Sequence, residues 1–196
     1  MVIFISKNSK KKKKGFLLTE AILSLFVLTI GLVSVVALIS SSLRDSFYSR
    51  DTIVAIQLSQ EGAELVRNVR DNGFLNNASN PFYKFDSSKK HCAIDYNVIV
   101  SNPLNCFSTK ASSYALNYSG GFYQHSVGTN TRFSRYVYVE YNGTDRAVVR
   151  SFVYWGAPTD GIPIFVIADV GSSGSITGCV ASKKCVFTEI TLTNWR

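Results

Sequence analysis

The sequence predicts an α+β fold: a long N-terminal helix, membrane-embedded in its first half, with an antiparallel sheet packed on its outer half. Three observations predict it. An almost unbroken apolar run extends from Phe16 to Ile39, a helical apolar stripe continues to Asn72 without a proline, and alternating strand patterns fill the C-terminal third. Hairpin-connected strands with one apolar face are expected to cover the exported part of such a helix.

The net charge of +8 is concentrated in the first 15 residues. They hold six of the 21 lysines and arginines and no acid, so the rest of the chain carries only +2. A nucleic-acid interface needs a basic patch on the folded part, and the bulk charge gives no sign of one. The hydrophobic content of 46% allows a buried core.

The apolar run is long enough to span a membrane. The 24 residues from Phe16 to Ile39 would extend about 36 Å as a helix, against about 30 Å of bilayer core. The lysines Lys10 to Lys14 precede the run and should stay cytoplasmic, which places everything after Ser40 outside. We therefore expect a basic leader at 1–15, a transmembrane and assembly helix at 16–43, and an exported half of the helix at 44–73.

Glu20 is a carboxylate near one end of this helix, and a charge in that position needs a partner. Three interpretations are open. The run is an uncleaved signal anchor with an incidental Glu20, or a secretory signal cleaved near Ser40 to Ser42, although it is longer than the usual ~7–15 residues. In the third, a peptidase cuts between Gly15 and Phe16, so that the new amine lies one helical turn from Glu20. The two charges then neutralise each other, within one chain or between staggered chains.

The third interpretation matches a family. The stretch from Lys14 through Gly15, Phe16 and Leu17 to Glu20, followed by an apolar helix, resembles the N-terminus of type IV prepilins and type II secretion pseudopilins. The resemblance implies that a prepilin peptidase removes the leader after Gly15 and N-methylates Phe16. It also implies that Glu20 meets the N-terminal amine of a neighbouring subunit during assembly.

The resemblance is strong over about 30 residues and weaker beyond them. Residues 60–72 look like the continuation found in minor pilins, and residues 192–196 share this similarity less clearly. Many pilins carry a proline in the first helix, whereas this chain has none before Pro81. The resemblance would imply local melting of this helix on assembly, but the missing proline argues against it.

The resemblance implies a structural subunit, a minor pilin or pseudopilin, of a type IV pilus or type II secretion-like filament. Its partners would be the prepilin peptidase, other pilin subunits, the membrane assembly platform and the membrane. It would be a single-pass inner-membrane protein whose exported domain becomes part of an extracellular or periplasmic filament. The alternatives are a filament-tip adhesin, a DNA-capturing minor pilin, or an anchored extracellular binding module that does not polymerise.

The exported half of the helix is predicted from an apolar stripe. Its members recur at intervals of seven and four residues, while charged residues occupy the remaining surface, and Gly73 suits a left-handed helix stop. The stripe consists of Phe47, Val54, Leu58, Leu65 and Val69; the charged residues are Arg44, Asp45, Arg50, Asp51, Glu61, Glu64, Arg67 and Arg70.

Residues 74–134 have weak periodicity and are expected to be mostly irregular, with one strand at Ile94 to Val100. Four cysteines on the exported side predict two disulfides, for which three connectivities are possible. Pairing between neighbours, Cys92 with Cys106 and Cys179 with Cys185, is the simplest. These spacings lack the close cysteine pairs of structural zinc sites, so no metal is expected.

Residues 135–196 are expected to form the antiparallel sheet. Alternation, β-branched content and turn residues place four strands there, with a hairpin turn at Asn142-Gly143 and a loop at Gly171 to Ser175. The strands are predicted at Tyr136 to Tyr141, Ala147 to Trp155, Ile162 to Val170 and Val186 to Thr193, and residues between Cys179 and Cys185 form a small exposed ring.

No pattern of catalytic residues is found, and the chain is not expected to be an enzyme or to hold a cofactor. His91 lies beside a half-cystine, and His125 is expected to be solvated in a loop. Asp160 and Asp169 are weak candidates for calcium. An aromatic cluster with two arginines could stack on bases or sugars, but core packing is the expected role, so nucleic acid stays an unsupported partner. This cluster contains Tyr114, Tyr118, Phe122, Tyr123, Arg132, Phe133, Arg135, Tyr136 and Tyr138.

Overall fold

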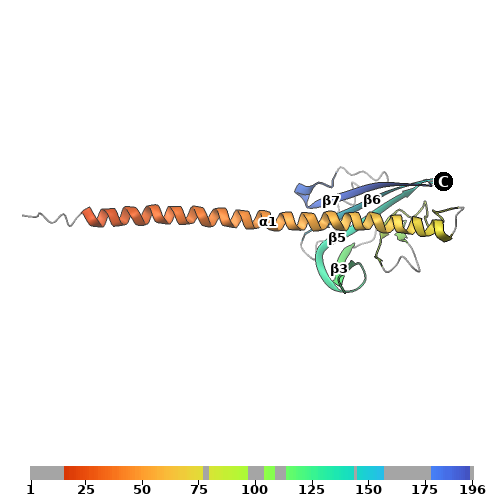
Figure 1. Cartoon of the computed structure of the whole chain (residues 1–196), viewed down its shortest axis with the longest axis horizontal. Helices are drawn as coiled ribbons and strands as arrows, with labels where there is room; N and C mark the ends of the chain where they lie inside the picture. The colour runs from red at the N-terminus through yellow and green to blue at the C-terminus, as the bar shows by residue number, and fades with distance from the viewer. Residues whose placement is uncertain are drawn as a thin grey trace, which may run out of the picture. The chain divides into compact units, whose positions relative to one another are not determined.

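The computed structural model describes residues 16–76, 80–96, 104–108, 114–143, 145–156 and 178–194. One long helix and seven strands confirm the α+β class (Figure 1). The chain divides into two units, Met1–Tyr48 and Ser49–Arg196, which are described separately. The elements are α1 (Phe16–Asn76), β1 (His91–Ala93), β2 (Asn105–Phe107), β3 (Ala115–Ser119), β4 (Phe122–Gln124), β5 (Thr129–Tyr141), β6 (Arg146–Trp155), the 3-10 helix η2 (Ala181–Lys183) and β7 (Cys185–Thr193).

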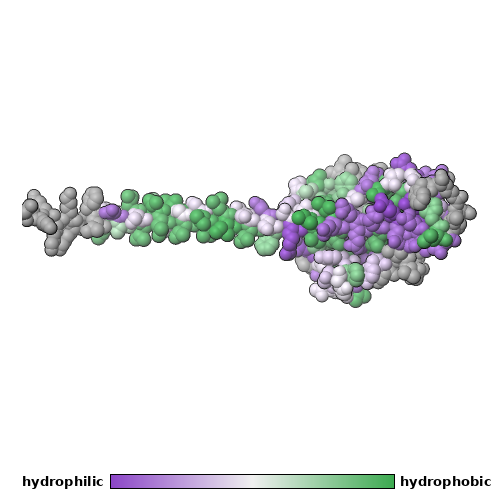
Figure 2. All heavy atoms as spheres, viewed as in Figure 1, coloured by the Kyte–Doolittle hydropathy of each residue, from purple (hydrophilic) through white to green (hydrophobic). Residues whose placement is uncertain are grey.

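The described part of the first unit consists of the apolar first half of α1. Its side chains are exposed and mostly hydrophobic (Figure 2), and an 18-residue stretch of it has a mean hydropathy of 2.8, which suits a membrane-spanning helix. Hydroxyl groups in it are satisfied locally, since Ser24, Thr29 and Ser34 donate hydrogen bonds to carbonyls three or four residues earlier. Such bonds remove the cost of exposing a hydroxyl to lipid.

The second unit is organised around β5. One edge of β5 pairs with β6 along its whole second part, from Phe133↔Trp155 to Tyr141↔Ala147, and β7 pairs with β6. The other edge of β5 is shared, with β3 near Thr129 and β1 near Tyr138. The sheet therefore divides into two arms on that side, β1–β2 and β3–β4.

The helix in the second unit packs on the sheet through the expected stripe. Leu58, Leu65 and Val69 are buried, with 3%, 9% and 1% of their surface exposed. Leu58 joins a cluster with Phe133 and Trp155 of the sheet, and Leu65 and Val69 join another; this second cluster also contains Val66, Val137, Val139, Ala147, Val149 and Leu192. Phe47, the first member of the predicted stripe, lies in the first unit and is 59% exposed.

Residues 133–139 of β5 are all buried because both faces of the strand are covered. Val137 and Val139 lie in the cluster with Leu65 and Val69 of α1, while Tyr136 and Tyr138 lie in a third cluster with Tyr114. The Cys179–Cys185 disulfide lies in this third cluster. An antiparallel strand covered on both faces loses the polar side that usually marks it in a sequence.

Gly73 does not end the helix, contrary to expectation, because α1 continues to Asn76 with Gly73 buried in it. The reason for a glycine here is a close approach. A Cβ on Gly73 would lie 2.1 Å from the backbone oxygen of Pro81, so only glycine lets residues 80–85 fold back onto the helix.

Two charged residues expected at the solvated helix surface are buried instead. Arg70 is 6% exposed, and its Nη1 donates to the carbonyl oxygen of Thr193 at 2.9 Å. Asp51 is 7% exposed and accepts from Arg132 Nη1 at 2.7 Å. Both side chains tie the helix to strands of the sheet, which a helical periodicity cannot reveal.

The region 74–134 is more regular than predicted, since it contains β1 to β4 and the start of β5. The strand predicted at Ile94 to Val100 is wrong for its first three residues, because β1 ends at Ala93. The β5–β6 hairpin forms with Gly143 at φ 88° as predicted, and β7 matches the last predicted strand. The strand predicted at Ile162 to Val170, the loop at Gly171 to Ser175, and Asp160 and Asp169 lie outside the described residues.

Candidate functional site

Glu20 lies exposed on the first half of α1. It shares a helix face with Leu23, Ser24, Val27 and Leu28, one and two turns further on. The next charged residue along the helix is Arg44, about 36 Å away at about 1.5 Å per residue. A partner for this carboxylate must therefore come from the N-terminal side of Glu20 or from another chain.

The predicted cleavage site lies partly outside the described residues. Gly15 is outside them, and Phe16 is within α1. Removal of the leader and methylation of Phe16 therefore stay predictions.

Both disulfides are present in the structure and join neighbours along the chain. Cys92–Cys106 links directly opposite positions of β1 and β2, and Cys179–Cys185 closes the ring around η2. The ring residues from Val180 to Lys184 are exposed, as expected, whereas the two half-cystines that close it are buried. Within the described residues no group of three or more metal-ligating side chains gathers at one place.

A buried charge network lies beneath the helix in the second unit, and sequence reasoning missed it. Its centre is Arg135, which is fully buried. Arg135 Nη1 lies 3.0 Å from Glu61 Oε1, and its Nη2 lies 3.8 Å from Asp95 Oδ1 and donates to the carbonyl oxygen of Ile94 at 2.7 Å. Gly62 lies against this site, because a Cβ there would be 2.3 Å from Ser151 Oγ and 3.0 Å from Arg135 Cδ.

His125 completes this network, so the expectation of a solvated loop histidine is wrong. Its Nδ1 lies 2.6 Å from Asp95 Oδ1, and its Nε2 lies 3.0 Å from the carbonyl oxygen of Arg135. A carbonyl oxygen only accepts hydrogen bonds, and an ionised carboxylate does too. The two contacts hold the imidazole ring between Asp95 and the backbone of β5.

The carboxyl group of Asp95 is ionised by this arrangement. Burial raises its pKa, but hydrogen bonds from the side chain and backbone of His125 and the charge of Arg135 outweigh burial, and the pKa lies below the ordinary value of 3.8. The network binds α1 to β5 and to the segment after β1, which is a structural role.

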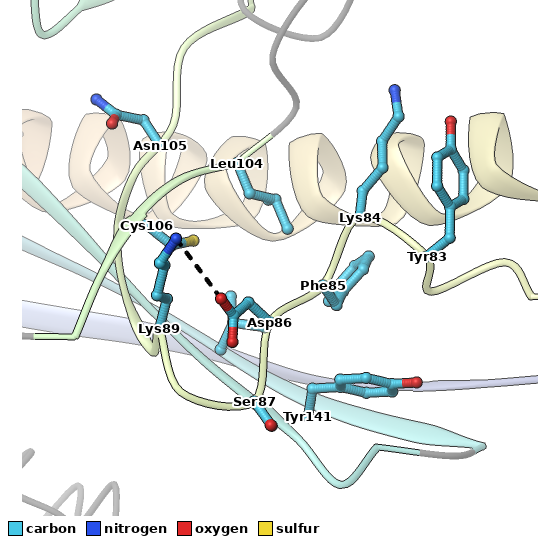
Figure 3. Close-up of a pocket in the computed structure, with 11 residues that line it drawn as sticks. Tyr83, Lys84, Phe85, Asp86, Ser87, Lys89, Leu104, Asn105, Cys106 and Tyr141 are labelled. Atoms are coloured by element: carbon cyan, nitrogen blue, oxygen red, sulfur yellow. Dashed lines mark ion pairs between the residues drawn. The ribbon is translucent and has the colours of Figure 1, made fainter.

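A separate pocket of about 590 Å³ opens beside the Cys92–Cys106 disulfide (Figure 3). Phe85 and Leu104 form its apolar wall, and Tyr141 of β5 lies along its lower side. Lys89 and Asp86 cross it as an ion pair at 3.6 Å. Asp86 also accepts from the hydroxyl of Ser88, which lowers its pKa.

The pocket offers no nucleophile with an activating base. Its sulfur atom, that of Cys106, is tied in the disulfide, and its charged groups are lysines and one carboxylate. The lysines, the carboxylate and the hydroxyl groups of this lining suit a polar ligand.

Comparison with known proteins finds no matching family, no similar curated protein and no similar solved structure. The long apolar helix followed by a sheet is compatible with a pilin-like architecture. The family resemblance therefore rests on the N-terminal sequence, and the function drawn from it is a proposal.

Most of the predicted aromatic cluster is core. Tyr114, Tyr136, Tyr138 and Phe133 are at most 6% exposed, and Arg135 is fully buried. Burial and the neighbouring phenols raise the pKa of Tyr136 well above its ordinary value, and its hydroxyl lies 2.5 Å from His91 Nδ1. These residues pack and are not available for stacking on a ligand.

The exposed aromatic residues gather instead at the β3–β4 hairpin. Tyr118 and Phe122 are 48% and 50% exposed, and the ring of Tyr118 lies 5.2 Å from that of Tyr123. Burial and the nearby Tyr118 raise the pKa of Tyr123, while Arg50 opposes this rise. Tyr123 packs against the cluster that contains Ala55 and Leu58, so the hairpin lies close to the start of the helix in this unit. Two glycines at its turn, with φ 60° and 90°, are the sequence signal that could have predicted it.

Proposed function

We propose that this chain is a structural subunit, a minor pilin or pseudopilin, of a type IV pilus or a type II secretion-like filament. A prepilin peptidase cuts between Gly15 and Phe16 and methylates the new N-terminus. The chain is then held in the membrane by the first half of α1 until other subunits and the assembly platform extract it into the filament.

The observation that carries the proposal is the exposed carboxylate of Glu20 on an otherwise uncharged apolar helix. Lipid tails are as apolar as the helix, so apolar contacts alone do not select one axial offset between neighbouring helices. A carboxylate in that environment is costly unless it meets a cation. The α-amino group of Phe16 in an adjacent subunit supplies one, and any other register leaves a charge unpaired.

The polar side chains elsewhere on this helix support the same reading. Ser24, Ser34 and Ser40 bond to their own backbone and so require nothing from a neighbouring helix. Within the described part of the helix, the carboxylate of Glu20 has no comparable hydrogen bond and no cation near it. Glu20 therefore gains a cationic partner only when the subunits assemble.

The test is the replacement Glu20→Gln or Glu20→Ala, with Ser24→Ala one turn away on the same face as the matched control. We expect both Glu20 variants to be exported and oxidised normally but to be depleted from sheared filaments, as measured by immunolabelling and quantitative immunoblotting. Ser24→Ala should incorporate as the wild type does. Normal incorporation of the Glu20 variants would overturn the role given to this carboxylate, and a chain found only as a membrane-bound monomer would favour the anchored binding module.

A further inference from the structure

We propose that one end of the second unit binds the anionic phospholipid headgroups of the membrane that holds the chain. This is the end at which α1 enters the unit, and we call it the proximal end. It comprises Arg50 and Asp51 of α1, Arg132 of β5, and Lys183 and Lys184 at η2. The inference goes beyond filament assembly and rests only on the membrane-anchoring part of the proposed function.

The two arginines of the proximal end meet at one carboxylate. Arg132 Nη1 lies 2.7 Å from Asp51 Oδ2, and Arg50 Nη2 lies 3.9 Å from Asp51 Oδ1. The Asp51 side chain is 9% exposed, whereas those of Arg132 and Arg50 are 52% and 70% exposed. Asp51 fixes the guanidinium of Arg132 in place while both arginines keep access to the outside.

The sheet brings the two lysines to the same end. The backbone N–H of Gly156 donates to the carbonyl oxygen of Arg132 at 2.9 Å, and the N–H of Trp155 donates to the carbonyl oxygen of Lys184 at 3.1 Å. Neighbouring strands are about 4.8 Å apart, so the backbones of Arg132 and Lys184 are separated by about 10 Å. Figure 1 shows η2 and the β3 side of the sheet at this end of the unit and the C-terminal residues at the other.

The lysine-bearing ring is held in one conformation. The Cys179–Cys185 disulfide closes it, and Lys184 adopts a left-handed backbone with φ 55° that is rare for residues other than glycine. Both lysines are exposed. A rigid basic turn can contact an anionic surface without first losing conformational freedom.

The charge balance at this end is positive. The five residues that define it include four cations and one acid, and that acid is already paired. Each lysine or arginine near an anionic bilayer strengthens binding by about fivefold. Asp51 offsets one of the four cations, so the five residues carry a net charge of +3, and this charge strengthens the attachment of a domain that is already tethered to the bilayer.

Aromatic residues beside the cations match the chemistry of a bilayer interface. Tyr118 and Phe122 of the β3–β4 hairpin are about half exposed, and Tyr123 connects them to the core through Phe133 at 6.0 Å. Tyrosine rings favour the headgroup level, where one side is apolar and the other is wet.

The short connection between the membrane helix and the proximal end favours the membrane as the partner of this end. Arg50 is seven residues beyond Leu43, where the uncharged helix ends. Seven residues span at most about 25 Å even when fully extended. The proximal end therefore stays within reach of the outer lipid surface at all times before assembly, whereas a soluble polyanion must compete with that surface.

The test uses the full chain reconstituted in nanodiscs of phosphatidylcholine alone or with one-third phosphatidylglycerol. Amide hydrogen exchange is followed for residues 115–124, 180–187 and the helix 18–43. The variant carries Arg50→Gln, Lys183→Gln and Lys184→Asn, since asparagine tolerates the left-handed backbone at Lys184. The matched control carries Lys84→Gln, Lys89→Gln and Lys90→Gln, which remove the same charge at the other end of β5.

We expect phosphatidylglycerol to slow exchange of residues 115–124 and 180–187 about threefold or more in the wild type and the control. The slowing should disappear in the proximal-end variant and in high salt. Equal exchange in the two lipids, or slowing that survives in the variant, would overturn the proposal. Slowing by an added DNA duplex in neutral nanodiscs, with none from phosphatidylglycerol, would overturn it in favour of nucleic acid. Fast exchange of residues 18–43 would instead reject the membrane anchor itself.

Discussion

A fully buried guanidinium is stable in a protein only where carboxylates and carbonyl oxygens replace the water that it has lost. Arg135 meets this condition in part. Its Nη2 donates to the carbonyl oxygen of Ile94, and the carboxylates of Glu61 and Asp95 lie 3.0 and 3.8 Å from its Nη1 and Nη2, whereas its Nε and Nη1 make no hydrogen bond within the described residues. Glu61 belongs to α1, whereas Ile94 and Asp95 follow β1. The network therefore reports whether the helix, β5 and the segment after β1 have all docked.

The first prediction concerns Asp95 and the stability of the protein at low pH. Since the pKa of Asp95 is lower in the folded chain than in the unfolded one, its contribution to stability is present above the unfolded value near 4 and is lost as pH falls through the folded value. We expect Asp95→Asn to destabilise the protein by about 1–3 kcal/mol at neutral pH and to reduce the loss of stability between pH ~5 and pH ~2. Denaturant unfolding of the detergent-solubilised chain at a series of pH values measures both.

The exposed Asp145 provides the control for that experiment. Asp145→Asn should leave the pH dependence as it is in the wild type, because this side chain is exposed. An unchanged pH profile in Asp95→Asn would contradict the stabilising role given to the carboxylate.

At the scale of elements, the Cys92–Cys106 disulfide joins the two strands of one arm of the sheet. A cross-link limits the freedom of the unfolded chain, and a loop of ~15 residues gains about 3 kcal/mol in this account. We expect Cys92→Ala with Cys106→Ala to cost about that much, and Cys179→Ala with Cys185→Ala, which opens a shorter ring, about 2 kcal/mol. Thermal unfolding with and without reductant shows whether loss of Cys92–Cys106 destabilises the protein more than loss of Cys179–Cys185.

That prediction also depends on the exported location of all four cysteines. Peptide mapping without reductant should recover the two neighbour pairs from membranes. Four free thiols in freshly extracted protein would place the domain in a reducing compartment and contradict the topology.

The elements that could be predicted from the sequence are those long enough to show a period. The stripe of α1, the alternation in the second half of β5, and β6 and β7 extend over at least six residues. β1, β2 and β4 have three residues each, which is too few for alternation to be visible. β1 and β2 also exist because they pair with strands brought near by the fold.

The candidate sites divide in the same way. The importance of Glu20 could be predicted from the sequence, because its neighbours along one helix define its environment. The network of Glu61, Asp95, His125 and Arg135 could not be predicted from the sequence. Its members are far apart in the chain, and only the docking of α1 on the sheet brings them together. The proximal end is hidden for the same reason, because its arginines and lysines come from three separate elements.

At the scale of the whole molecule, processing decides between the interpretations of the N-terminus. We expect the mature protein to begin at Phe16 with an N-methyl group, because Gly15 and Glu20 have the spacing that resembles prepilins. Intact-mass measurement of the membrane-extracted chain checks this. Replacing Gly15 by leucine should retain the leader, and a mature terminus near Ser42 would identify a secreted protein instead.

The shared edge of β5 has a consequence for how the second unit opens. The β1–β2 arm and the β3–β4 arm are each attached to the same edge of β5 but at different halves, while β6 pairs with the opposite edge from Phe133 to Tyr141. Either arm can therefore detach as a separate subglobal unit while the three strands β5, β6 and β7 stay paired. In native-state hydrogen exchange under mild denaturant, we expect the two arms to give two distinct opening free energies, and the amides of β5 bonded to β6 to exchange only by global unfolding.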